Sequence, residues 1–216
     1  RRVYLGAKAT LPNGWSANFN YDFANSSFDA AFIEWRANDA FFVDAGFRKV
    51  PFGLEEYYTS SGNLRAIERS PADRYFVESN NGRRLGAGSY RTGVFVGGKA
   101  DSGLYYNAAV TNPERDESAT SATGVGTTGT SANNNLSYWG NVGYTSKVAE
   151  TWTYNVGAGV GYLPDQGGTK LGAGDNLTVY DLYTEVSNAD WDFQAEYFGS
   201  NNQHGVSATK DSSSWG

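Results

Sequence analysis

The stretch WSANFNYDF at residues 15–23 alternates strictly between two kinds of side chain. Its odd-numbered positions are aromatic or alanine: Trp15, Ala17, Phe19, Tyr21 and Phe23. Its even-numbered positions are short and polar. Successive side chains of an extended strand point to opposite faces of a sheet. This stretch therefore predicts a β-strand with one apolar and one polar face.

The same period of two recurs in LYYNAAVT (104–111), WTYNVGAGVGY (152–162) and WDFQAEYF (191–198). These runs approach the roughly ten residues of a strand that crosses a membrane. Aromatic residues stand at the ends of several runs, where a membrane–water interface favours them. A soluble β-sandwich also alternates, but its strands are commonly about five or six residues long. The pattern predicts an all-β, transmembrane antiparallel β-barrel, with a soluble carbohydrate-binding β-sandwich as the alternative from another class.

The composition agrees with a barrel that is apolar outside and wet inside. The 216 residues include 15 Tyr, 12 Phe and 6 Trp, and yet the mean hydropathy is -0.53. No apolar run approaches the roughly 20 residues that a spanning helix needs. The chain has no cysteine, which excludes disulfides and thiol chemistry. The net charge of -6 argues against a nucleic-acid partner.

Ten strands are predicted, and they form a single outer-membrane β-barrel domain over residues 1–216. Their ranges are 2–11, 15–24, 28–36, 41–49, 85–100, 104–112, 135–145, 152–163, 177–186 and 191–199. Every odd-numbered strand is followed by a short connection, typically rich in Gly, Asn and Asp, as tight hairpins require. Most even-numbered strands are followed by long connections. This arrangement is typical of outer-membrane barrels, whose long loops are extracellular.

The parity of the connections places both ends of the ten-strand chain at the extracellular rim. Ten strands with both ends there do not make a natural closed barrel. We therefore expect an open, partial set of strands, about ten of the sixteen or so of a porin-like barrel.

The longest connection with apolar anchors is residues 50–84, where the charged stretch GFRKVPFGLEEYYTSSGNLRAIERSP (46–71) leaves the alternating pattern. Pro51 cannot donate a ladder hydrogen bond, and Gly53 permits a sharp change of direction. Phe52, Leu54 and Ile67 are too apolar to stand in open water. An ordinary ordered rim loop is one interpretation. The sharper one is an extracellular loop that folds into the pore and narrows it.

The elements GFRKVPFGLEE, AIERS and FQAEYF resemble the phosphate-selective porin O/P family of bacterial outer membranes, as does the opening RRVYLGAKATLPNGWSANFNYDFA. The resemblance spans most of residues 1–112 and again 177–199. It implies a homotrimer of about sixteen-stranded pores that pass small anions through the outer membrane. The lysine cluster and arginine column of that family's phosphate channels find no residue-by-residue match here.

Charge counting on the polar face adds candidates for the pore lining. The early strands carry more basic inward residues, and the late strands carry acidic ones, so opposed walls would set a field across the pore. Glu68 is expected to hold one of the neighbouring arginines. The pore-lining or constriction candidates are Arg48, Arg65, Arg69, Arg74, Arg91, Lys99, Glu68, Asp181, Glu185, Asp192 and Glu196.

The predicted function is passive diffusion of small hydrophilic solutes and ions, with an anion- or phosphate-selective channel as the alternative. We expect no enzyme, because the single histidine, His204, lies in a polar loop and forms no arguable Ser–His arrangement. We expect no cofactor and no metal, since no loop has the ligand spacing of a Ca²⁺ site. The expected partners are the lipid bilayer, small ions or anionic solutes and further copies of the chain.

Overall fold

The computed structural model describes residues 3–24, 26–59, 64, 66, 68–77, 85, 87–112, 135–149, 151–167, 175–207 and 210–216. Eleven strands form one antiparallel sheet in strict chain order, from β1 to β11. They are β1 (Tyr4–Thr10), β2 (Trp15–Asp22), β3 (Ser27–Asn38), β4 (Phe41–Lys49), β5 (Tyr90–Lys99), β6 (Leu104–Thr111), β7 (Ser137–Val148), β8 (Trp152–Gly167), β9 (Asp175–Ser187), β10 (Asp192–Ser207) and β11 (Lys210–Trp215).

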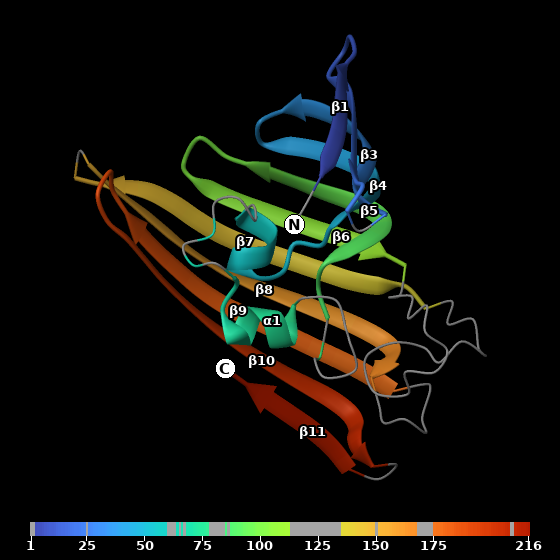
Figure 1. Cartoon of the computed structure of the whole chain (residues 1–216). Helices are drawn as coiled ribbons and strands as arrows, with labels where there is room; N and C mark the ends of the chain where they lie inside the picture. Colours follow the sequence, from blue (N-terminus) through green and yellow to red (C-terminus); the bar gives the residue numbers. More distant parts are fainter. Residues whose placement is uncertain are drawn as a thin grey trace.

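The predicted all-β antiparallel architecture is confirmed. The sheet is also open, as expected, because β1 and β11 stand at opposite edges of the strand order. Figure 1 shows the sheet curving around two short helical segments that lie against one face, η1 (Leu54–Tyr58) and α1 (Pro71–Phe76). Within the part of the chain that the structure describes, no helix is both long enough and apolar enough to cross a membrane.

The number of strands and the direction of the last one are corrected by the structure. The sequence KDSSSW of β11 lacks apolar alternation, so the period-two pattern did not reveal it. Its backbone pairs with β10 in register, for example Ser214 with Ser200. Because β11 runs antiparallel to β10, it returns toward the end that carries the short connections. The expectation that the last strand ends at the rim of the long connections is therefore wrong.

Hairpin turns join the strands at the end of the sheet where short connections were predicted. In the first one, Asn13 (φ 61°) and Gly14 (φ 80°) both adopt the left-handed conformation that a tight hairpin turn demands. Asn188 closes another, since its side-chain oxygen accepts the Trp191 backbone N–H at 2.7 Å. In Figure 1 the β5–β6 and β9–β10 turns both lie at the left-hand ends of their strands.

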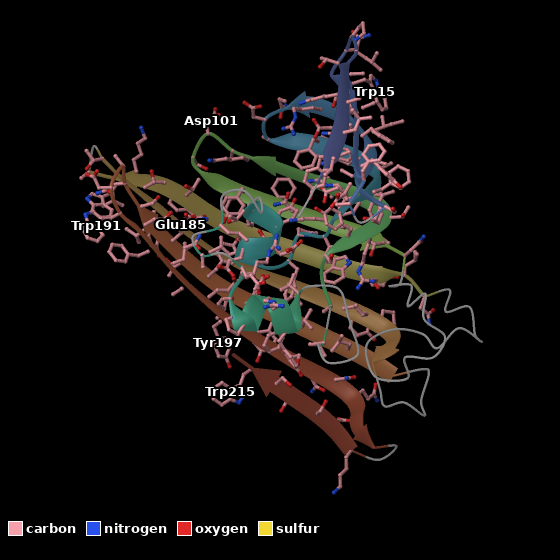
Figure 2. The ribbon with its side chains drawn as sticks, viewed as in Figure 1. Trp15, Asp101, Glu185, Trp191, Tyr197 and Trp215 are labelled. Carbon is pink, nitrogen blue, oxygen red and sulfur yellow. The ribbon has the colours of Figure 1, made fainter. Side chains whose placement is uncertain are left out.

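The two faces of the sheet differ as the alternation predicts. One face exposes large apolar side chains such as Val142 (51% exposed), Leu182 (56%) and Phe193 (58%). The other face, here called the inner face, carries Asn141 and Asp181 and is covered in part by the helical segments. Figure 2 shows Tyr197 on the side of the ribbon turned away from the helices and Glu185 on the same side as them.

Candidate functional site

The segment between β4 and β5 leaves the sheet at the Pro51–Phe52–Gly53 corner. β4 ends at Lys49, two residues before the proline. Gly53 has φ 84°, and an added Cβ there would lie 3.0 Å from Val77 and 3.1 Å from the Asp73 carboxylate. The π-helix η1 follows at once, with the Tyr57 N–H bonded to the Gly53 carbonyl at 2.9 Å. The described residues 50–59 and 68–77 are called the covering segment below.

Aromatic packing fixes the covering segment to the inner face of β7 and β10. The Phe52 ring lies 6.1 Å from Trp139 and 5.9 Å from Phe198 between ring centroids. The Phe76 ring stacks on Phe198 at 5.3 Å. Both segment rings are buried in the main hydrophobic cluster of the molecule. The core of this protein therefore lies between the covering segment and the sheet.

The helix α1 is built by local capping. The Ser70 hydroxyl accepts the Asp73 backbone N–H at 3.1 Å, and Pro71 stands at the first helical position, where its missing N–H costs nothing. The helix packs against β10, and the Tyr75 hydroxyl lies 3.3 Å from the Ser214 hydroxyl of β11. Through these contacts the covering segment extends along the inner face as far as the β11 edge of the sheet.

The tip of the covering segment meets the wall through uncharged polar groups. The Tyr57 hydroxyl donates to Asn107 Oδ1 at 3.2 Å. The Tyr58 hydroxyl donates to Asn141 Oδ1 at 2.7 Å and accepts from Asn107 Nδ2 at 3.2 Å. Tyr183 of β9 also donates to Asn141 Oδ1, at 3.2 Å. We call Tyr57, Tyr58, Asn107 and Asn141 the tyrosine–asparagine anchor.

Glycines of β7 and β8 create the space in which the wall tyrosines lie. An added Cβ at Gly143 would meet the Tyr105 hydroxyl, and one at Gly157 would meet the Tyr183 hydroxyl. The two rings extend toward each other over these glycines, and their hydroxyl oxygens are 2.9 Å apart. The inward glycines thus accept neighbouring side chains.

Ion pairs hold the outer part of the covering segment. The Glu56 carboxylate lies 2.9 Å from Lys49 Nζ and 2.6 Å from Arg69 Nε. Arg69 is also 3.6 Å from Asp73. The Glu55 carboxylate accepts the Ser70 backbone N–H at 2.7 Å, which ties η1 to the start of α1.

Comparison with known protein families assigns the chain to one of them. The model of the family described as phosphate-selective porin O and P matches residues 1–213. The chain belongs to this family. No curated protein matches it. The protein is thus a porin of the bacterial outer membrane, and family membership assigns it to channels rather than to enzymes. The alternative of a soluble carbohydrate-binding sandwich is wrong, since all eleven strands belong to one sheet.

The basic candidate Arg48 of the porin wall is held by a carboxylate and by aromatic rings. Arg48 pairs with Asp44 and lies 5.1 Å from the Phe32 ring and 5.3 Å from the Phe95 ring. Aromatic faces attract a guanidinium at such distances. Arg48 is therefore fixed against β3, β4 and β5.

Two further basic candidates differ from Arg48 in exposure. Arg91 is buried, with its guanidinium donating to the Ala87 carbonyl at 2.7 Å and lying 5.3 Å from the Trp139 ring. Lys99 is exposed near the end of β5. Of the two, only Lys99 presents its charge to solvent in the described structure.

The candidates within the covering segment are also paired. Arg74 forms an ion pair with Glu68, and Arg69 is held by Glu56. Arg65 lies outside the described residues. The segment therefore offers paired charge rather than a row of isolated cations.

The acidic candidates fall into a covered and an uncovered group. Asp181 is buried, and Glu196 accepts the Leu54 backbone N–H at 2.7 Å, so both lie beneath the covering segment. Glu185 is half-buried and Asp192 is exposed. Among the described residues, no group of three or more His, Cys, Asp or Glu side chains is placed to hold a metal ion.

The tyrosine–asparagine anchor was missed by the sequence analysis. Asn107 and Asn141 stand at inward positions of their alternating strands, so their face was available from the pattern. Their hydrogen-bond partners could not be predicted from the pattern. These bonds join a loop to strands about 50 and 83 residues away, and such distant contacts produce no periodicity in the sequence.

Proposed function

We propose that the chain forms one wall of a diffusion channel for small hydrophilic solutes and ions, and that the covering segment narrows this channel. The carrying observation is the burial of Phe52 and Phe76 against the inner face. Burial of two aromatic side chains is enough to hold a loop against the inner wall of a water-filled barrel. A loop at the rim would have no comparable apolar surface to cover. The extracellular loop of residues 50–84 is thereby the constriction.

The charge arrangement favours weak ion selectivity. Glu56 lies against Lys49 and Arg69, and Glu68 against Arg74. Paired charges present little net potential to a passing ion. We expect reversal potentials close to zero in asymmetric KCl, measured on the full-length protein in planar bilayers. A strongly displaced reversal potential would contradict the weakly selective channel.

Anion or phosphate preference is the second candidate. It is favoured by Arg36, whose side chain is 39% exposed on the same wall while bound at 3.0 Å to Glu34. A guanidinium keeps its charge and binds oxyanions with a planar fork. Under this candidate Arg48→Ala and Arg74→Ala shift the reversal potential away from anions, and phosphate blocks the chloride current. Glu68→Ala loosens the covering segment and raises conductance under both candidates.

We also propose that the remaining wall candidates contact passing solutes. They are Lys99, Glu185 and Asp192.

The proposal includes a homotrimer, which the family resemblance implies. Bands of trimer mass on unheated gels, lost on boiling, are the expected result. Migration as a single chain under both conditions would contradict the trimer and leave the channel proposal intact.

A further inference from the structure

We infer that Asn107 and Asn141 are the positioning residues of the constriction, and that their uncharged anchor keeps its opening constant when salt and pH change. The inference rests on the proposed function, since it concerns how the covering segment is held. It goes further by naming which wall residues set the position of the segment tip and why ionic conditions leave them unaffected.

The position of the anchor on the wall is set by strand register. Asn107 and Asn141 are direct partners across β6 and β7, so their side chains stand next to each other on the inner face. Asn107 is the fourth of the eight residues of β6, so the pair sits near the middle of that strand. The tip residues Tyr57 and Tyr58 reach this level from a corner at the end of β4. The anchor thus holds the segment deep in the barrel rather than at its rim.

The wall behind the anchor holds the Asn141 side chain in a fixed orientation. Asn141 Oδ1 accepts two hydroxyls, one from Tyr58 and one from Tyr183. The Tyr183 hydroxyl is in turn 2.9 Å from the Tyr105 hydroxyl. The wall thus helps to hold the acceptor atom toward the tip, and acceptors held in place bind more tightly than mobile ones.

The anchor carries no formal charge, in contrast to the ion pairs of the outer segment. Salt screens exposed charges over about 10 Å at 0.1 M, whereas a hydrogen bond between neutral groups is not screened in this way. The charged or titratable groups that face the two tyrosines are Arg48 of β4, Tyr105 of β6 and Tyr183 of β9.

Burial raises the pKa of both Tyr57 and Tyr58 above the ordinary value. A tyrosine with a raised pKa keeps its hydroxyl proton, and hence its donor, to higher pH than a free one. The asparagines do not titrate. The tip should therefore stay docked from acid to mildly alkaline conditions.

The test compares Asn141→Leu and Tyr58→Phe with the matched control Asn155→Leu in the full-length porin. Asn155 Oδ1 accepts the hydroxyl of the wall residue Tyr105 at 2.7 Å. Its replacement therefore leaves the hydrogen bonds of Tyr57 and Tyr58 to the wall in place. The first readout is trypsin cleavage of the Arg69–Ser70 bond in proteoliposomes, because proteolysis follows the population of the released segment. Loss of one hydrogen bond should raise the cleavage rate about fivefold.

The second readout is single-channel conductance. Asn141→Leu and Tyr58→Phe should each raise it, and the effect of the double variant should be smaller than the sum of the two single effects, because both remove the Tyr58–Asn141 bond. Wild-type conductance, divided by bulk conductivity, should stay constant between about 0.1 M and about 1 M KCl and between about pH 5 and about pH 9. Heat-dependent gel mobility confirms that each variant forms a folded barrel.

Two results would overturn the inference. One is that cleavage and conductance of Asn141→Leu and Tyr58→Phe match those of Asn155→Leu. The other is that the normalised wild-type conductance rises with salt. If Phe52→Ala still opens the channel in either case, the proposed function survives and only the anchor is wrong. If Phe52→Ala has no effect either, the constriction itself is refuted.

Discussion

Replacing Phe52 by alanine should release the covering segment and leave the barrel intact. The Phe52 side chain is completely buried and contacts the rings of Trp139 and Phe198. Removing a buried phenylalanine costs about 3–5 kcal/mol, and this includes the two ring contacts. Since no strand pairing involves this residue, the loss falls on docking of the segment. The ratio of released to docked segment should rise by about 10²–10⁴-fold.

The assay pairs conductance with a structural readout. The Phe52→Ala porin should show a higher single-channel conductance and faster cleavage at Arg69–Ser70. Phe193→Ala makes the same chemical change at a side chain that is 58% exposed on the opposite face, so it should leave both quantities unchanged. Heat-dependent gel mobility should show a folded barrel for both variants. Wild-type conductance and cleavage in a folded Phe52→Ala protein would refute the role of the segment as the constriction.

Three further changes test the two faces and the charged base of the segment. Leu182→Arg should cost about 2–4 kcal/mol of folding free energy in bilayers, and Gln194→Arg on the inner face much less; equal costs would contradict the assignment of faces. Gly157→Ala should destabilise the barrel by about 1–3 kcal/mol by displacing the tyrosine ring that lies over it, whereas Gly140→Ala, whose Cβ would meet only one side chain at 3.6 Å, should not; urea unfolding separates them, and equal midpoints would exclude the packing argument. Glu56→Gln removes the carboxylate charge that Lys49 and Arg69 share and leaves Arg69 only its 3.6 Å contact with Asp73. It should weaken segment docking by about 3–5 kcal/mol, seen as faster cleavage at Arg69–Ser70; an unchanged rate would show that these ion pairs contribute nothing to docking.

Local alternation was enough to predict most of the sheet. The split between Asn141 and Val142 appears both in the sequence and in the structure, because neighbouring strand residues always point to opposite faces. The hairpin at Asn13–Gly14 was equally local, since its backbone conformation is available only to a few residue types. β11 escaped prediction because its serines give no apolar alternation, although its backbone pairs with β10.

The candidate site was predictable only in outline. The corner at Pro51 and Gly53 and the apolar residue between them indicated a segment that turns and docks. The sequence could not show that Glu196 receives the Leu54 N–H, because that bond joins residues 142 positions apart. It also presented Glu56 as one charge among many, whereas the fold gives it two cationic partners.

The sequence by itself determined the strand faces, the short turns and the family of this porin, since each depends on residue type and spacing within about ten positions. Only the tertiary structure decided what lies over the inner face. Side chains there are brought together by strand register and by one long connection, so Asn107 and Asn141 become neighbours although 34 positions separate them in the chain. Alternation fixes which way a side chain points, whereas the group it meets depends on the whole path of the chain.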